Sequence, residues 1–219
     1  MKKKEKSSLE LEQELFERYP RLISCKDDFE KAFIALKDCY KSGGKLLVAG
    51  NGGSTSDSEH IVGELMKSFL FNRKVDSEFE KKMTSIWGKD GAALAAKLEG
   101  ALAAIPLTSM PALTSAIAND VDWAIGFAQM LYGYGDEGDV LLAISTSGNS
   151  KNIIYALMTA KAKSIKSIVL TGSGAGSCRN LADIVISVPE SETFKIQELH
   201  IPIYHALCSM LEAEFFEER

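Results

Sequence analysis

The chain contains several short, continuously apolar runs, and most of them lead into a segment rich in Gly and Ser. Strands of a parallel sheet are covered by helices on both faces, so they have apolar side chains on both faces. The pattern therefore predicts five strands, at Leu46–Ala49, Ala101–Leu107, Val140–Ile144, Ser167–Leu170 and Ile184–Val188.

Between these runs apolar residues recur at helical spacing. Strands that alternate with helices predict an α/β fold, with a doubly wound, mainly parallel five-stranded sheet flanked by helices. Ligands of such sheets bind beyond the carboxyl ends of the strands. We expect helices at residues 7–18, at 25–41, from about Asp57 onward, and at Ala112–Ala118, Trp123–Leu131, Asn152–Ala162 and Thr193–Phe216.

One segment interrupts this alternation. Val75–Gly100 is charged in its first half and Ala-rich in its second, and Phe79, Met83 and Trp87 are spaced by four. This spacing predicts one or two short amphipathic helices. We expect a single domain over residues 1–219, with N-terminal helices in 1–42 and a helical insertion at about 75–100.

Composition excludes several classes of protein. The 219 residues carry a net charge of −5, which argues against a nucleic-acid partner. No apolar run approaches the roughly 20 residues of a membrane span, and no export signal is recognisable. The four cysteines, scattered without C-x-x-C spacing, are expected to be free thiols. These features predict a soluble cytoplasmic protein without a membrane partner.

Two strand–loop–helix units carry the candidate chemistry. Glycines and hydroxyl side chains before a helix N-terminus favour anion binding, although one such loop alone could be only a tight turn. Neither loop is a Walker A sequence or a complete G-x-G-x-x-G fingerprint. Hydroxyls and loop N–H groups suit a monophosphate ester. We expect Ser145, Thr146, Ser147 and Ser150 to hold phosphate, and Asn51, Gly52, Gly53 and Ser54 to face the carbon chain of the ligand.

Histidines supply a second candidate site. His60 and Glu64 are four residues apart on one helix face, and Gln197 and His205 lie roughly on one face of the last helix. Together they would form a mixed nitrogen and oxygen site suited to zinc or a similar divalent ion. Spacing alone leaves the alternative open, because His–Glu pairs also occur on ordinary solvated faces. We assign no chemistry to His200.

A family resemblance adds to this interpretation. The segments GNGGSTSDSEHIVGE, AIAND (residues 116–120), GDVLLAISTSGNS and TFKIQELHIPIYHAL resemble successive motifs of bacterial phosphoheptose isomerases, which have the sugar-isomerase (SIS) fold. The resemblance extends from about Lys31 to Glu214 and leaves out Val75–Gly100. The glycine- and serine-rich loops occur throughout the SIS fold, whereas the His-x-x-x-Glu and Gln-Glu-x-His-x-x-x-x-His combination is more specific.

The resemblance implies a set of site residues and an assembly. It implies a homotetramer with active sites at subunit interfaces, and a sugar phosphate as the ligand. It implies zinc ligands at His60, Glu64, Gln197 and His205, phosphate contacts at Ser145, Thr146, Ser147 and Ser150, and sugar contacts at Asn51, Gly52, Gly53, Asn119, Asp120 and Gln197.

The resemblance also implies a reaction. D-sedoheptulose 7-phosphate would be converted to D-glycero-D-manno-heptose 7-phosphate through a cis-enediol, for the synthesis of lipopolysaccharide or surface polysaccharide. Glu64 would act as the base at carbon, and His205 would move the proton between the two oxygens. Zinc would polarise the carbonyl.

Two departures from the family pattern leave alternatives open. Val75–Gly100 is an extra segment, which could be a surface hairpin that lengthens a subunit interface or a lid over the site. Ser109-Met110-Pro111-Ala112 stands where the family often has Asp and hydroxyl residues. The alternatives are an isomerase of another sugar phosphate and a non-catalytic protein that binds a sugar phosphate or a partner.

Overall fold

Five parallel strands form the centre of the molecule. A computed structural model describes residues 6–216, and residues 1–5 and 217–219 of the predicted domain lie outside the described residues. The sheet has the order β2-β1-β3-β4-β5, and every neighbouring pair is parallel, so the predicted architecture is confirmed. The strands are β1 (Leu46–Gly50), β2 (Ala104–Pro106), β3 (Val140–Ile144), β4 (Lys166–Thr171) and β5 (Ile184–Ser187).

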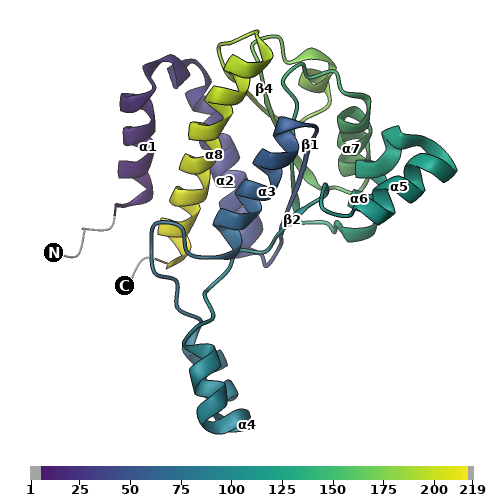
Figure 1. Ribbon diagram of the computed structural model, residues 1–219. Coiled ribbons are helices and arrows are strands. Elements are labelled where there is room, and N and C mark those ends of the chain that lie inside the picture. Colours follow the sequence, from purple (N-terminus) through teal and green to yellow (C-terminus); the bar gives the residue numbers. More distant parts are fainter. Residues whose placement is uncertain (1–5, 217–219) are drawn as a thin grey trace.

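Helices cover both faces of the sheet (Figure 1). Successive side chains of a strand point to opposite faces, and the structure therefore has two cores. Val48 and Leu142 belong to the core under α1, α2, α3 and α8, whereas Leu47 and Leu141 belong to the core under α6 and α7. The helices of the first core are α1 (Ser8–Arg18), α2 (Lys26–Lys41), α3 (Gly53–Met66) and α8 (Thr193–Phe216); on the other side are α5 (Pro111–Ile117), α6 (Gly126–Tyr134) and α7 (Lys151–Ala162).

The helix after β1 begins earlier than the sequence predicts. We expected it from about Asp57, whereas α3 begins at Gly53. Gly52 has a φ of 56°, a conformation that glycine adopts without a Cβ clash, so the chain turns sharply and enters the helix at once. Asp57 consequently lies in the second turn of α3. Ser54 is buried under the first turn, while Asn51, Gly52 and Gly53 stay exposed.

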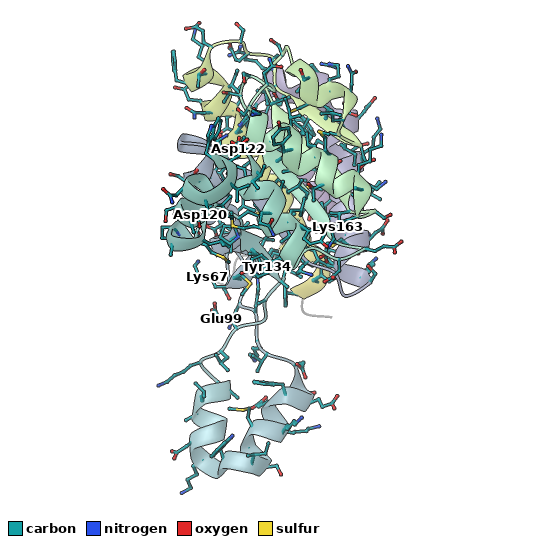
Figure 2. All side chains as sticks on the ribbon, turned by 90° about the vertical axis from the view of Figure 1, so that its right-hand side faces the viewer. Lys67, Glu99, Asp120, Asp122, Tyr134 and Lys163 are labelled. Carbon is teal, nitrogen blue, oxygen red and sulfur yellow. The ribbon has the colours of Figure 1, made fainter. Side chains whose placement is uncertain are left out.

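The insertion forms an arm that projects away from the body of the molecule (Figures 1 and 2). It consists of α4 (Ser77–Ala95), which is sharply bent at Gly88, so the prediction of one or two short helices is confirmed. The arm leaves the body through a neck at Lys74 and Glu99, which form an isolated antiparallel bridge. Since α3 runs back from the carboxyl end of β1, the arm emerges at the opposite end of the sheet from the Gly/Ser loops.

None of the helices in residues 6–216 combines the length and the apolar character needed to cross a membrane. Cys25, Cys39, Cys178 and Cys208 are all free and buried, as predicted. Burial raises the pKa of Cys25, Cys39 and Cys178 to about 11, so these thiols stay protonated near neutral pH.

Candidate active site

The two Gly/Ser loops lie side by side at the carboxyl ends of β1 and β3. Gly50 pairs with Ile144 in the sheet, so both strands end at the same level. The side chains of Asn51 and Asn152 then join the loops directly: each Nδ2 donates to the other's Oδ1, at 2.9 and 2.8 Å. We expected Asn51 to face the ligand. The structure gives its amide a partner in the second loop–helix unit.

The second loop is a compact turn of hydroxyl groups and backbone N–H groups. The Gly148 N–H donates to Ser145 Oγ at 3.2 Å, and Ser145 Oγ donates to Ser150 Oγ at 3.3 Å. Gly148 has a φ of 65°, and a Cβ there would lie 2.0 Å from the Ala175 carbonyl oxygen, so this position requires glycine. The Ser150 side chain makes no capping bond at the start of α7. The helix N-terminus is thus available to an anion.

Gln197 lies beside the first loop. A Cβ at Gly53 would be 2.6 Å from Gln197 Nε2, so glycine at the start of α3 permits the close approach of this amide. Within residues 6–216, no hydrogen bond joins Gln197 to His60, Glu64 or His205.

His60, Glu64 and His205 meet on the flank of the molecule where α3 and α8 lie side by side. His60 Nε2 is 3.1 Å from Glu64 Oε1 and 3.4 Å from His205 Nε2. His60 is seven residues beyond Gly53, which corresponds to about 10 Å along α3. The cluster is therefore two helical turns away from the loops at the sheet edge.

Tyr204 contacts the other ring nitrogen of His60, and Asp57 in turn binds Tyr204. Tyr204 Oη is 3.2 Å from His60 Nδ1 and donates to Asp57 Oδ1 at 3.3 Å. In the tautomer that satisfies both contacts, His60 Nδ1 carries the proton and donates to Tyr204, which leaves the lone pair of Nε2 directed toward Glu64 and His205. Histidines that bind metals have such partners on the second nitrogen.

Burial sets the charge state of the groups around this cluster. The pKa of His205 is lowered, first by burial and then by His60, against an opposing effect of Glu64. Burial raises the pKa of Asp57, although its bond with Tyr204 and the nearby His60 work in the other direction. The second carboxylate oxygen of Asp57 is buried and has no partner among the described residues. Because its pKa is lowered from the ordinary value of 6.5, His205 is neutral near pH 7.

Two of the spacings in this cluster match those between zinc ligands. Ligand atoms at about 2.0–2.1 Å from a tetrahedral zinc are about 3.3 Å apart, close to the spacings of His60 Nε2 from Glu64 Oε1 and from His205 Nε2. In this arrangement, no group of three or more His, Cys, Asp or Glu side chains of residues 6–216 could hold a metal ion. No hydrogen bond joins Glu64 to His205 in this part of the chain.

Asn119 and Asp120 lie in a π-helical turn, Ala118–Asp122, between α5 and α6. Asn119 Nδ2 donates to Asp120 Oδ1 at 2.8 Å, and both residues are exposed. Neighbouring Asp122 approaches Lys151, the first residue of α7, at 3.6 Å. Figure 2 shows Asp120 and Asp122 close together on the body, above the arm. The structure thus places this turn beside the second loop rather than beside His60.

The segment that departs from the family pattern contacts the helix of the site. Ser109 Oγ donates to Glu59 Oε1 at 2.9 Å, and Glu59 immediately precedes His60 on α3. Met110 precedes the first turn of α5, which Pro111 begins. Ser109 therefore joins this segment to α3, the helix that carries His60 and Glu64.

A cavity of about 570 Å³ reaches His205 from the side of α1. Leu70 and Phe71 line it together with Ile201 of α8. The residues of the Ser145–Ser150 loop do not belong to its lining, so this cavity opens to the histidine cluster and not to the predicted phosphate site.

Sequence reasoning missed four polar residues of the site: Asn152, Asp57, Tyr204 and Arg73. Asp57 stands three residues before His60, so helical spacing could have placed it next to the cluster. Tyr204 directly precedes His205, and successive helix positions do not face each other, so spacing gave no such signal for Tyr204. Asn152 follows the serine loop by two residues. No local signal identified Arg73, whose partner Glu212 is 139 residues away.

The fold and the paired loops define a SIS domain, and a SIS domain family model matches residues 102–213. The chain is 38% identical to phosphoheptose isomerase 2 of Campylobacter jejuni, over 85% of this chain and 80% of that protein. It is 34% identical to phosphoheptose isomerase of Sulfurimonas denitrificans, over 99% and 95% of the two chains. The structure of phosphoheptose isomerase GmhA from Neisseria gonorrhoeae superposes with a TM-score of 0.69 at 30% identity, covering 94% of this chain and 92% of that one.

The chain belongs to the phosphoheptose isomerase family, and it is an isomerase with the SIS fold. The predicted family and fold class are therefore confirmed.

Proposed function

We propose that this protein converts D-sedoheptulose 7-phosphate to D-glycero-D-manno-heptose 7-phosphate, for heptose synthesis in lipopolysaccharide or surface polysaccharide. The observation that carries the proposal is the meeting of His60, Glu64 and His205, a carboxylate and two imidazoles, in a chain of this family. A module that only binds a sugar phosphate needs the loops but has no use for this group.

The reaction is a proton transfer between neighbouring carbons. The carboxylate of Glu64 removes a proton from C1 of the ketose, and the electron pair forms the C1–C2 double bond of a cis-enediol. The same carboxyl group returns the proton to C2. His205, neutral near pH 7, takes the proton of the C1 hydroxyl and delivers it to the C2 oxygen. No atom is gained or lost, and no oxidant is needed.

Zinc is the cofactor that we propose for this site. His60, Glu64 and His205 would hold it, and Gln197 would complete the set after its amide turns away from Gly53. A bound zinc ion would polarise the carbonyl and stabilise negative charge on the enediolate oxygen. The spacing of the nitrogen and oxygen atoms and the Tyr204 contact to His60 Nδ1 support this assignment.

The phosphate belongs at the other end of the site in this proposal. The N–H groups and hydroxyls of Ser145, Thr146, Ser147 and Ser150 would hold it near the start of α7, where a dianion is favoured. Asn51, Gly52 and Gly53, with Asn119, Asp120 and Gln197, would line the carbon chain between the two ends. The separation of about 10 Å along α3 suits a substrate whose phosphate and reacting carbons are at opposite ends.

The test of the proposed base is Glu64→Gln. We expect kcat for sedoheptulose 7-phosphate to fall by about 10²- to 10⁴-fold, because the amide cannot accept the carbon-bound proton. Glu30→Gln, which changes a partly exposed carboxylate on α2, should leave kcat unchanged. Near-normal turnover by Glu64→Gln would disprove the assignment.

The substrate and the metal are tested together with a panel of ketose and aldose phosphates. Metal-stripped protein should lose turnover of sedoheptulose 7-phosphate, and added zinc should restore it. Turnover of another sugar phosphate in preference would reassign the substrate. Binding without turnover of any member would favour a non-catalytic role.

We also propose a cytoplasmic homotetramer in which neighbouring subunits complete the sites. Met66 on α3 and Phe194 and Ile201 on α8 are exposed apolar residues on the two helices that carry the site. Burial of such side chains drives association. Light scattering should give the mass of four subunits, and a monomeric mass at assay concentrations would contradict the proposal.

A further inference from the structure

A fully buried ion pair lies next to the histidine cluster. Arg73 precedes the arm and Glu212 lies near the end of α8, and both side chains have no exposed surface. Arg73 Nε donates to Glu212 Oε1 at 2.7 Å. Burying charges costs free energy unless every polar atom has a hydrogen-bond partner. The partners of the remaining nitrogen and oxygen atoms therefore show which segments this ion pair connects.

The other guanidinium nitrogens bind the end of α3. Arg73 Nη2 donates to the carbonyl oxygen of Glu64 at 2.8 Å, and Nη1 donates to that of Leu65 at 2.7 Å. The last carbonyls of a helix have no partner within the helix, and a cation there is also favoured by the helix dipole. Arg73 therefore acts as the cap of the turn that carries Glu64.

The carboxylate of Glu212 binds the segment that follows α3. Its Oε1 accepts from the Phe69 N–H at 2.8 Å, and its Oε2 accepts from the Leu70 N–H at 2.7 Å. Glu212 is seven residues after His205 on α8, or two helical turns. The pair thus joins the backbone of Glu64 on α3 to the helix that carries His205.

We propose that Arg73 and Glu212 are positioning residues of the isomerase site, which set the carboxylate of Glu64 relative to His205. Neither touches substrate; they act by fixing the last turn of α3 against α8. The inference rests on the proposed function, in which Glu64 and His205 are the reacting side chains. A displacement of about 1 Å in such a site costs on the order of 100-fold in rate.

The decisive variant is Arg73→Lys, which keeps the charge but cannot bind Glu212 and both carbonyls with one planar group. We expect kcat to fall at least tenfold with KM within twofold. We expect zinc affinity of the metal-stripped protein, measured by competition with a chromophoric chelator, to fall at least tenfold as well. The second readout does not depend on turnover.

Asp139→Asn is the matched control. Asp139 is a buried carboxylate paired with Lys45 at 2.6 Å, and both residues immediately precede strands, at the end of the sheet opposite the loops. This variant should lower the melting temperature while leaving kcat and zinc affinity within twofold of the wild type. If Arg73→Lys does not accumulate as folded protein, the uncharged double variant Arg73→Met/Glu212→Leu takes its place, since it leaves no unpaired buried charge.

Two results would overturn the inference. One is kcat and zinc affinity within twofold of wild type in the Arg73 variant although its melting temperature falls. The other is an equal loss of kcat in Asp139→Asn, because general destabilisation would then explain both. Failure of the proposed function is distinguishable, because it would appear as normal turnover in Glu64→Gln.

Discussion

Among single residues, His200 is a fully buried polar side chain whose ring nitrogens are not paired within residues 6–216. It lies on α8 between Gln197 and His205 and has no exposed surface. Neither ring nitrogen makes a hydrogen bond of ordinary geometry within the described part of the chain. Burial lowers the pKa of His200 from 6.5 to about 4, against a smaller opposing effect of the Thr171 backbone. The folded protein therefore holds this imidazole in its neutral form, and His200 packs behind the site.

This pKa makes stability depend on pH. Below pH 6.5 the unfolded chain binds a proton that the folded protein does not bind until about pH 4, so stability falls as the pH is lowered through this window. Between pH 6.5 and 5 the loss from His200 amounts to about 2 kcal/mol. In urea denaturation at pH 7 and pH 5, His200→Leu should lose about 2 kcal/mol less than the wild type. Equal losses in both proteins would contradict the prediction.

At the scale of the element, the parallel packing of α3 and α8 brings the site together. Gln197 meets Gly53 near the start of both helices, and His205 meets His60 two turns further along. Both helices pack on the same face of the sheet (Figure 1). One helix pair therefore carries the predicted base, the proton shuttle and all four candidate metal ligands.

Gly53→Ala tests the first of these contacts. The new Cβ would lie 2.6 Å from Gln197 Nε2, the end of a flexible side chain, which can swing aside at little cost in stability. We expect KM to rise several-fold because the Gln197 amide is displaced, while the melting temperature changes by less than about 2 °C, which corresponds to less than about 1 kcal/mol.

Gly63→Ala is the control for that variant. A Cβ at Gly63 meets no atom within 4 Å, so the same substitution on the same helix should leave KM unchanged. An unchanged KM in Gly53→Ala would show that the position of the Gln197 amide does not matter for substrate binding.

At the scale of the whole molecule, the arm is the part that stands apart (Figures 1 and 2). Ile86 and Trp87 are more than half exposed on it. Its two halves pack tightly on each other, since a Cβ at Gly91 would lie 2.1 Å from the Met83 carbonyl oxygen. The arm points away from the Gly/Ser loops, which argues against a lid over the site of the same chain and, in the homotetramer that we propose, favours a contact with a neighbouring subunit.

The arm can be deleted because its two ends lie next to each other at the neck. Lys74 and Glu99 pair across it, and the Gly100 N–H donates to the Arg73 carbonyl at 2.9 Å. Replacement of Val75–Leu98 by Asn-Gly, which suits a two-residue antiparallel turn, should leave the subunit folded with a melting temperature within about 4 °C of the wild type. Sedimentation should show weaker association. An unfolded product, or unchanged association, would contradict this account of the arm.

The sheet and the residue types of the site can be predicted from the amino-acid sequence. Continuous apolar runs can be buried only between two layers of helices, so the five strands and the α/β class follow from pattern alone. The long α8 covers Thr193–Phe216, as its periodicity predicts. The motifs around His60, Ser145 and His205 indicated the family, because each combines loop glycines or ligand-type side chains at a defined spacing.

Which of these residues meet, and which contacts hold them in place, follows from the packing of the folded chain. His60 and His205 are 145 positions apart, Asn51 and Asn152 are 101 apart, and Arg73 and Glu212 are 139 apart. Periodicity describes which face of its own helix a residue occupies, whereas such contacts depend on how two helices or two loops pack. The direction of the arm is likewise fixed by the antiparallel run of α3 along β1, which no local pattern along the chain reveals.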